Sequence, residues 1–181
     1  METLPDYIDS GLRILSIGLN PSPPSVAAGY YFAGKQNRFW KALNASGLLA
    51  AALEPSPQAM QQLLQLERIG FTDTVKRPTP GAGGLRKGDF RRDLPLLLDL
   101  ILQYQPAIAW FHGKVAWRHY REIIDGVKDA DLSWGLQTSG IGSAQVFVSP
   151  NPSPANAVFS LDDLIASYRE LAALAPPVQA R

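Results

Sequence analysis

The chain of 181 residues contains no cysteine and two histidines, His112 and His119. These counts exclude disulfides, thiolate nucleophiles and cysteine-bound metal clusters, and they argue against a transition-metal site. Seventeen basic residues against sixteen acidic ones give a formal charge of +1. The overall charge therefore does not favour nucleic acid as a partner, while the length fits one domain with a substantial core.

The first half of the chain predicts one strand followed by two helices. An apolar run at residues 12–19, ended by Asn20, is typical of a buried strand that opens into a loop. Prolines stiffen the loop over 21–34, and its glycines permit close backbone approach. Asn37 is expected to cap the next helix, and a further helix is predicted over 56–68.

The second half continues the alternation. Residues 69–75 predict a short strand, and after a loop rich in proline and glycine the leucine spacing predicts a helix over 88–104. Buried strands are expected at 107–113, which leads into another helix, and at 145–150. Ser160 is the expected cap of the last helix.

This alternation predicts a mostly parallel sheet with helices on both faces, in a single domain over 1–175 with a frayed tail at 176–181. Ligands of such sheets bind outside the carboxyl ends of the strands. The loops that leave those ends should therefore converge on one cleft, and they span 20–36, 72–92 and 150–159. Because no stretch has the length of a signal peptide or a membrane span, we expect a cytoplasmic protein with no membrane partner. We also expect it to be a monomer.

A basic stretch lies between the predicted strand at 69–75 and the helix that follows. It contains one acid, Asp89, among six cations: Lys76, Arg77, Arg86, Lys87, Arg91 and Arg92. Beside glycine and proline, such a run suits a loop that grips phosphates, and the alternative is a solvated helix start. Arg86 and Lys87 are the candidates for contacts to DNA.

Four ordered blocks carry a family resemblance over nearly the whole chain. GLNPS, GYYFAGKQNRFW, GFTDTVKRPTPG and VSPNPSPANA, at 18–22, 29–40, 70–81 and 148–157, resemble the mismatch-specific uracil and thymine DNA glycosylases in order and spacing. The resemblance implies a three-layer αβα sandwich with a short, mostly parallel central sheet. It further implies DNA, single or double stranded, as substrate, hydrolytic removal of uracil or another damaged base, and neither cofactor nor metal.

Such an enzyme must flip the nucleotide out of the duplex before it hydrolyses the bond between sugar and base. Positive charge develops on the sugar and negative charge on the departing base, so the site needs a placed water and donors at a base oxygen. By resemblance, Asn20 holds the water and Asn151 stabilises the charge on the base. The alternative for both residues is an Asn-Pro turn, which residue type alone favours for Asn20.

Asp73, at the carboxyl end of a predicted strand, is expected to orient or deprotonate the water. Its alternative is an aspartate that caps the following turn. By resemblance, Phe32 stacks on the flipped base and Tyr30 shares this contact or lines the entrance, although aromatic clusters belong more often to a core. The remaining base-binding residues that the resemblance implies are Gly18, Leu19 and Ser153.

The last loop departs from the family pattern. Members often carry leucine or arginine there, which wedges into the gap left by the flipped nucleotide, whereas this chain continues with Ser153, Pro154, Ala155 and Asn156. These four residues are expected to contact DNA. Since Ala155 fills little of the gap, this loop argues against strict mismatch specificity. The main alternative to a glycosylase is a module that binds DNA lesions without cleaving them. An unrelated nucleotide-binding protein has little support, because the chain lacks the glycine-rich motifs of that class.

Overall fold

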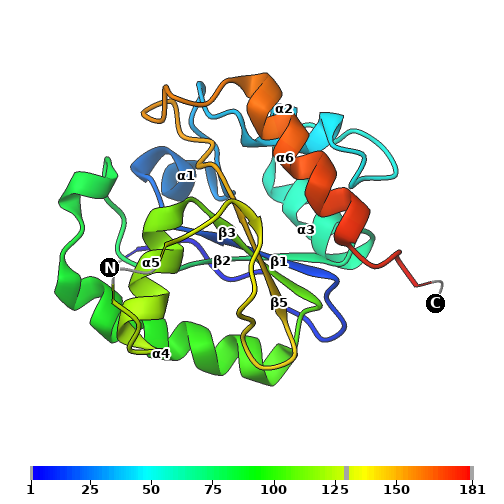
Figure 1. Ribbon diagram of the computed structural model, residues 1–181. Helices are drawn as coiled ribbons and strands as arrows, with labels where there is room; N and C mark the ends of the chain where they lie inside the picture. The colour runs from blue at the N-terminus through cyan, green and yellow to red at the C-terminus, as the bar shows by residue number, and fades with distance from the viewer. Residues whose placement is uncertain (1, 129–130, 180–181) are drawn as a thin grey trace.

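The computed structural model describes residues 2–128 and 131–179, and it contains a five-stranded sheet in the order β2-β1-β3-β5-β4 (Figure 1). β1 pairs in parallel with β2 and β3, and β3 pairs in parallel with β5, whereas β4 is an antiparallel edge strand. The strands are β1 Ile14–Gly18, β2 Ile69–Asp73, β3 Ile108–His112, β4 Gly135–Leu136 and β5 Gln145–Ser149.

Helices cover both faces of this sheet, which gives the predicted αβα sandwich (Figure 1). Alternate strand residues point to opposite faces, so the two faces bury different side chains. Ile14, Phe71 and Trp110 pack under α2, α3 and α6, and Ile17 and Phe111 pack under α4 and α5. The helices are α1 Pro23–Ala28, α2 Phe39–Ala45, α3 Pro57–Gln65, α4 Lys87–Tyr104, α5 Lys114–Ile123 and α6 Leu161–Leu174, with a 3-10 turn η1 at Ala82–Gly84.

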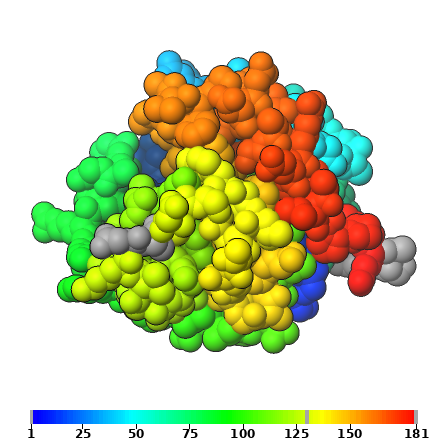
Figure 2. Space-filling view, in the orientation of Figure 1, coloured from blue at the N-terminus to red at the C-terminus, as the bar shows by residue number. Residues whose placement is uncertain are grey.

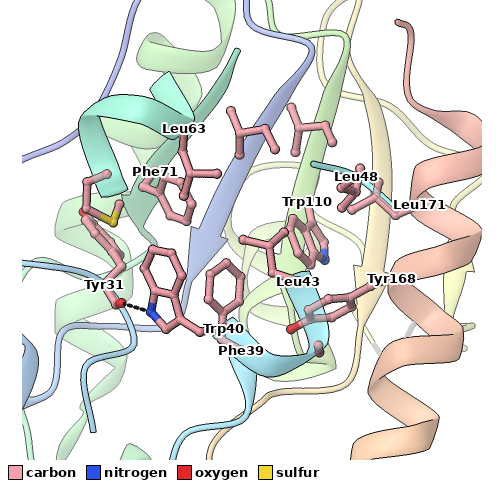
Figure 3. Close-up of a cluster of buried hydrophobic side chains, with 14 of the residues drawn as sticks. Tyr31, Phe39, Trp40, Leu43, Leu48, Leu63, Phe71, Trp110, Tyr168 and Leu171 are labelled. Carbon is pink, nitrogen blue, oxygen red and sulfur yellow. Dashed lines mark hydrogen bonds between the residues drawn. The ribbon is translucent and has the colours of Figure 1, made fainter. Parts of the chain in front are cut away.

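One of the two cores is rich in aromatic rings, as Figure 3 shows. Phe39 from α2 meets Tyr168 from α6 above Trp110 of the sheet, and Trp40 packs edge-on against Phe39. The indole Nε1 of Trp40 donates to the carbonyl oxygen of Tyr31 at 3.0 Å, which satisfies a buried donor and fixes the loop before α2. The loop after β1 is therefore anchored on a rigid layer.

The strand register brings the carboxyl ends of β1, β2, β3 and β5 to one edge of the sheet. Gly18 lies beside Asp73, and His112 lies beside Ser149. The residues that follow these strands start the loops that the sequence predicted to converge. The aligned carboxyl ends of these strands therefore form the floor of the candidate site.

The structure differs locally from the sequence prediction. The loop over 21–34 contains the short helix α1, because Ser22 accepts a hydrogen bond from the backbone N–H of Ser25 and Gly29 takes the left-handed conformation that ends a helix. The predicted helix over 88–104 contains Pro95 in its middle, on the exposed side, where water can reach the carbonyl oxygen that proline leaves without a donor. Leu94 and Leu97 hold this helix on the sheet.

The first residues of the carboxyl-terminal tail contact the segment that precedes β1. Arg13 donates to the carbonyl oxygen of Pro176 at 3.4 Å, and residues 180–181 of the predicted frayed tail lie outside the described residues. Among the helices of the described chain, none is both long and apolar enough to cross a membrane.

Candidate active site

A cavity of about 360 Å³ opens at the carboxyl edge of the sheet, with a volume at the lower end of the range for small-ligand sites. Segments 18–37, 73–82 and 151–156 contribute most of its wall, so the predicted convergence of three loops is confirmed. In the space-filling view the blue segment around α1 lies set back between the green segment after β2 and the orange loop after β5 (Figure 2). The residues from the sequence prediction in this wall are Gly18, Leu19, Asn20, Phe32, Asp73, Asn151, Ser153, Ala155 and Asn156.

Asn20 lies two residues after the end of β1, and hydrogen bonds fix the orientation of its amide. Its Nδ2 donates to Thr79 Oγ1 at 2.7 Å and to the carbonyl oxygen of Arg77 at 2.9 Å. Thr79 in turn donates to the carbonyl oxygen of Gly81 at 2.8 Å, so its Oγ1 acts as an acceptor toward Asn20. Because both amide hydrogens are engaged, Asn20 offers the cavity its carbonyl oxygen, which accepts no hydrogen bond within the described chain.

Asn151 follows β5 and has the opposite orientation. Its Oδ1 accepts from the backbone N–H of Ser153 at 2.9 Å, so the Asn-Pro turn of the alternative interpretation is present. The same bond leaves the Nδ2 hydrogens of Asn151 without a protein acceptor among the described residues. The cavity therefore receives an acceptor from one asparagine and donors from the other.

Asp73 ends β2 and is 3% exposed. Its Oδ2 is closed off from water and has no hydrogen-bond partner in the described part of the chain. Burial, together with the charge of Asp6, raises the pKa of Asp73 to about 7, although Lys76 acts in the opposite direction. A buried carboxyl without a partner is a costly feature, which is common where a site needs a proton donor or acceptor.

Gly18 makes room for this carboxyl. A Cβ atom at position 18 would lie 2.3 Å from Asp73 Oδ1 and 3.9 Å from Phe32 Cζ. Since Gly18 and Asp73 are register partners on β1 and β2, only a residue without a side chain lets the carboxyl reach the cavity.

Phe32 lies in the cavity wall with a left-handed backbone, φ 58°, which is uncommon for a residue with a large side chain. Its ring is stacked on that of Phe39 with centroids 4.2 Å apart, so Phe39 supports it from the core side and Phe32 is the ring at the cavity. Tyr30 instead packs edge-on against Trp40 and is absent from the cavity wall, whereas its neighbour Tyr31 lines it. The ring positioned to stack on a ligand is therefore that of Phe32.

The loop after β5 is held by Arg38, a residue that the sequence did not single out. Its guanidinium donates to the carbonyl oxygens of Pro152, Ser153, Asn156 and Phe159. Ser153 and Asn156 line the cavity, and Pro154 is exposed outside it. The amino-acid sequence carried no signal for this contact, because Arg38 lies more than a hundred residues before the loop.

The basic stretch lies beyond the rim of the cavity. Arg86 and Lys87 are exposed, and Lys87 Nζ lies 2.9 Å from Glu122 Oε1. Arg77 donates to both oxygens of Asp89, and these bonds hold the pKa of that carboxyl well below its usual range. Part of the stretch is therefore neutralised internally, while the exposed Arg86 forms no ion pair within residues 2–128 and 131–179.

Among the wall residues that were not predicted as site residues, Thr79 and His112 carry polar side chains that matter for the site. Thr79 belongs to the block GFTDTVKRPTPG, so the resemblance could have suggested it. His112 ends β3, and its position at the carboxyl edge of a parallel strand was the available signal.

The chain is similar to known proteins in sequence and in fold. The model of the uracil DNA glycosylase superfamily matches residues 5–172. The fold is also that of a uracil DNA glycosylase candidate from Methanosarcina acetivorans, solved by NMR, with a TM-score of 0.58 and 22% identity over 94% of this chain and 97% of that one. With this match over most of its length, the chain belongs to the uracil DNA glycosylase superfamily.

Proposed function

We propose that this protein is a monofunctional glycosylase that removes uracil from DNA by hydrolysis and leaves an abasic site. The observation that carries the proposal is the opposed orientation of two asparagine amides in one cavity. Asn20 offers an acceptor and Asn151 offers donors, beside the open face of Phe32. Hydrolysis of an N-glycosidic bond requires one acceptor for water and donors for the leaving base.

A base enters this cavity only after it leaves the stack, so the proposal includes base flipping. The extruded base stacks on the ring of Phe32, whose other face is already covered by Phe39. This aromatic support recognises any planar base and gives no sequence preference. Discrimination between bases is left to the polar atoms at the edges of the cavity.

In the reaction, the bond between C1′ and the base nitrogen breaks, and its electron pair goes to the base. Asn151 Nδ2 donates to the base oxygen on which this charge develops. Asn20 Oδ1 accepts a hydrogen bond from the water, whose oxygen then bonds to C1′. The ionised form of Asp73 takes the proton that the water loses, so no metal or cofactor is needed to balance the step.

The proposed substrate form follows from the loop after β5. Ala155, Asn156 and Ser153 lie in the cavity wall, and the exposed Pro154 stands beside them for contact to DNA. The single methyl group of Ala155 offsets little of the cost of extruding a base from a stable pair. We therefore propose that the enzyme, acting as a monomer, prefers uracil in single strands or weak mismatches over uracil paired with adenine.

The test uses purified protein and labelled oligonucleotides that contain one uracil, both single-stranded and paired. We expect release of free uracil in chelator-containing buffer, and strand cleavage only after alkali or heat. Asn20→Ala should lower single-turnover release by at least about a hundredfold, in line with loss of a catalytic contact, while DNA binding changes little. The matched control is Asn44→Ala, because Asn44 is exposed and its amide bonds to the backbone of Leu53 outside the cavity.

Three outcomes would contradict the proposal. Equal release by the parent and Asn20→Ala would show that Asn20 is not catalytic. Tight binding of uracil-containing DNA without any release would favour the alternative of a lesion-binding module. Strand cleavage that borohydride traps would instead reveal a lysine nucleophile.

A further inference from the structure

His112 is a polar residue of the cavity wall that the proposed chemistry does not use. It ends β3, is 1% exposed, and its Nδ1 has no hydrogen-bond partner in the described chain. Buried side-chain nitrogens rarely remain unpartnered in a structural core, so a partner is expected to come with the ligand.

The other ring nitrogen of His112 already has a partner in the sheet. Nε2 lies 2.8 Å from the hydroxyl oxygen of Ser16, which is fully buried on β1 and has no second partner among the described residues. If Ser16 donates to Nε2, the Nδ1–H is left without an acceptor; if Nε2 donates to Ser16, the Nδ1 lone pair is left without a donor. A uracil ring brings a carbonyl oxygen, which needs a donor, so the proposed function calls for the first arrangement, with the hydrogen on Nδ1.

The ring is neutral at physiological pH, because burial lowers the pKa of His112 to about 3. A neutral imidazole with its hydrogen on Nδ1 is a single donor at that position. It attracts an uncharged carbonyl oxygen without the strong preference of a cation for anions.

The aromatic stack places this donor beside the base. The centroid of His112 lies 5.0 Å from that of Phe32 and 5.5 Å from that of Phe39, with interplanar angles of 61° and 75°. His112 therefore stands along the edges of the two stacked rings and slightly nearer to Phe32, which is the ring at the cavity. A base that continues the stack on Phe32 brings its own edge toward His112.

We propose that His112 determines base specificity: its Nδ1–H donates to the carbonyl oxygen at position 4 of a pyrimidine or position 6 of a purine. Uracil and hypoxanthine carry an oxygen there, whereas cytosine and adenine carry an amino group that would set donor against donor. The substrate class is then the keto bases formed when cytosine and adenine lose their amino groups. This inference rests on the proposed glycosylase function and identifies which bases the same cavity accepts as substrates.

The test compares pairs of bases that differ only in this oxygen. Single-stranded oligonucleotides carry either uracil or 2-pyrimidinone, which has hydrogen at position 4, and either hypoxanthine or unsubstituted purine. The intrinsic reactivity of each base cancels when the rate ratio within a pair is compared between parent and variant. His112→Phe should reduce the preference for the oxygen-bearing base by about tenfold, the worth of one buried hydrogen bond.

Two further variants separate recognition from folding. His112→Asn keeps an N–H donor and should retain more of the preference than His112→Phe. His119→Phe is the matched control, because the ring of His119 is stacked on Phe90 and is absent from the cavity wall. Circular dichroism and the unfolding midpoint of each variant report whether the fold is kept.

The tautomer gives an independent readout that does not depend on activity. With two histidines in the chain, a long-range ¹H–¹⁵N spectrum at neutral pH resolves both rings, and His112 should show its hydrogen on Nδ1. A hydrogen on Nε2 would overturn the inference, as would an unchanged preference in a folded His112→Phe that still releases uracil. Absence of uracil release by the parent would instead refute the proposed function itself.

Discussion

Asp73→Asn should make the protein more stable at neutral pH and less active. Burial raises the pKa of Asp73 to about 7 from the ordinary 3.8. The folded state therefore keeps a proton that the unfolded chain releases once the pH exceeds about 4. Stability falls wherever the folded state binds more protons, so the free energy of unfolding of the parent should decrease as pH rises from about 4 to about 7 and then level off.

The magnitude follows from the same difference in pKa. From 3.8 to about 7 there are about 3 pH units, each worth about 1.4 kcal/mol, so ionisation of Asp73 costs the folded state about 4 kcal/mol at most. Asparagine removes this cost but introduces an amide whose buried hydrogens cost about 1–3 kcal/mol when they are unpaired. That penalty does not depend on pH, so the slope with pH isolates the ionisation of Asp73.

The assay is urea unfolding of parent and variant from pH 4 to pH 8. The stability of Asp73→Asn relative to the parent should rise steadily up to about pH 7 and stay constant above it. Asp99→Asn, an exposed aspartate on α4, is the matched control for loss of one carboxylate. A difference between Asp73→Asn and parent that stays flat over this range would refute the reasoning that burial holds the proton on Asp73.

Activity should respond in the opposite sense. If the ionised form of Asp73 takes the proton of the water, single-turnover release of uracil by the parent should rise about tenfold for each pH unit below about 7 and level off above it. Asp73→Asn should lose this pH dependence together with most of the rate. A parent rate that falls as the pH rises through 7 would mean that the protonated acid is the active form.

Three other predictions concern the geometry of the site. Gly18→Ala should displace the carboxyl of Asp73 through the 2.3 Å contact, lower the rate of uracil release by about tenfold or more and cost about 1–3 kcal/mol in urea unfolding; a fully active variant would contradict this close approach. Arg38→Ala should free the carbonyl oxygens of the last loop and increase amide hydrogen exchange there, with Lys41→Ala as the exposed control on α2; unchanged exchange would show that the loop holds its shape alone. Ala155→Leu should raise the ratio of duplex to single-strand rates, and a parent that already prefers a stable duplex would contradict this reasoning about the missing wedge.

The sequence by itself determined the framework of the site. Apolar runs ended by Asn-Pro or by Asp placed Asn20, Asp73 and Asn151 at the carboxyl ends of strands, because a buried strand must lose its apolar pattern where it emerges. In a parallel sheet those ends meet at one edge, so the convergence of the loops followed from the alternation of strands and helices. The ordered motifs added the superfamily, which the match over residues 5–172 confirms.

The tertiary structure decided how each side chain can act. The amide of Asn20 is oriented by Thr79, the last loop is held by Arg38, and Nε2 of His112 is paired with Ser16; every one of these partners is distant in the chain. Hydrogen-bond direction depends on which polar atoms meet after folding, and residue type does not reveal it. The same holds for the pKa of Asp73, which is set by burial that only the packed structure creates.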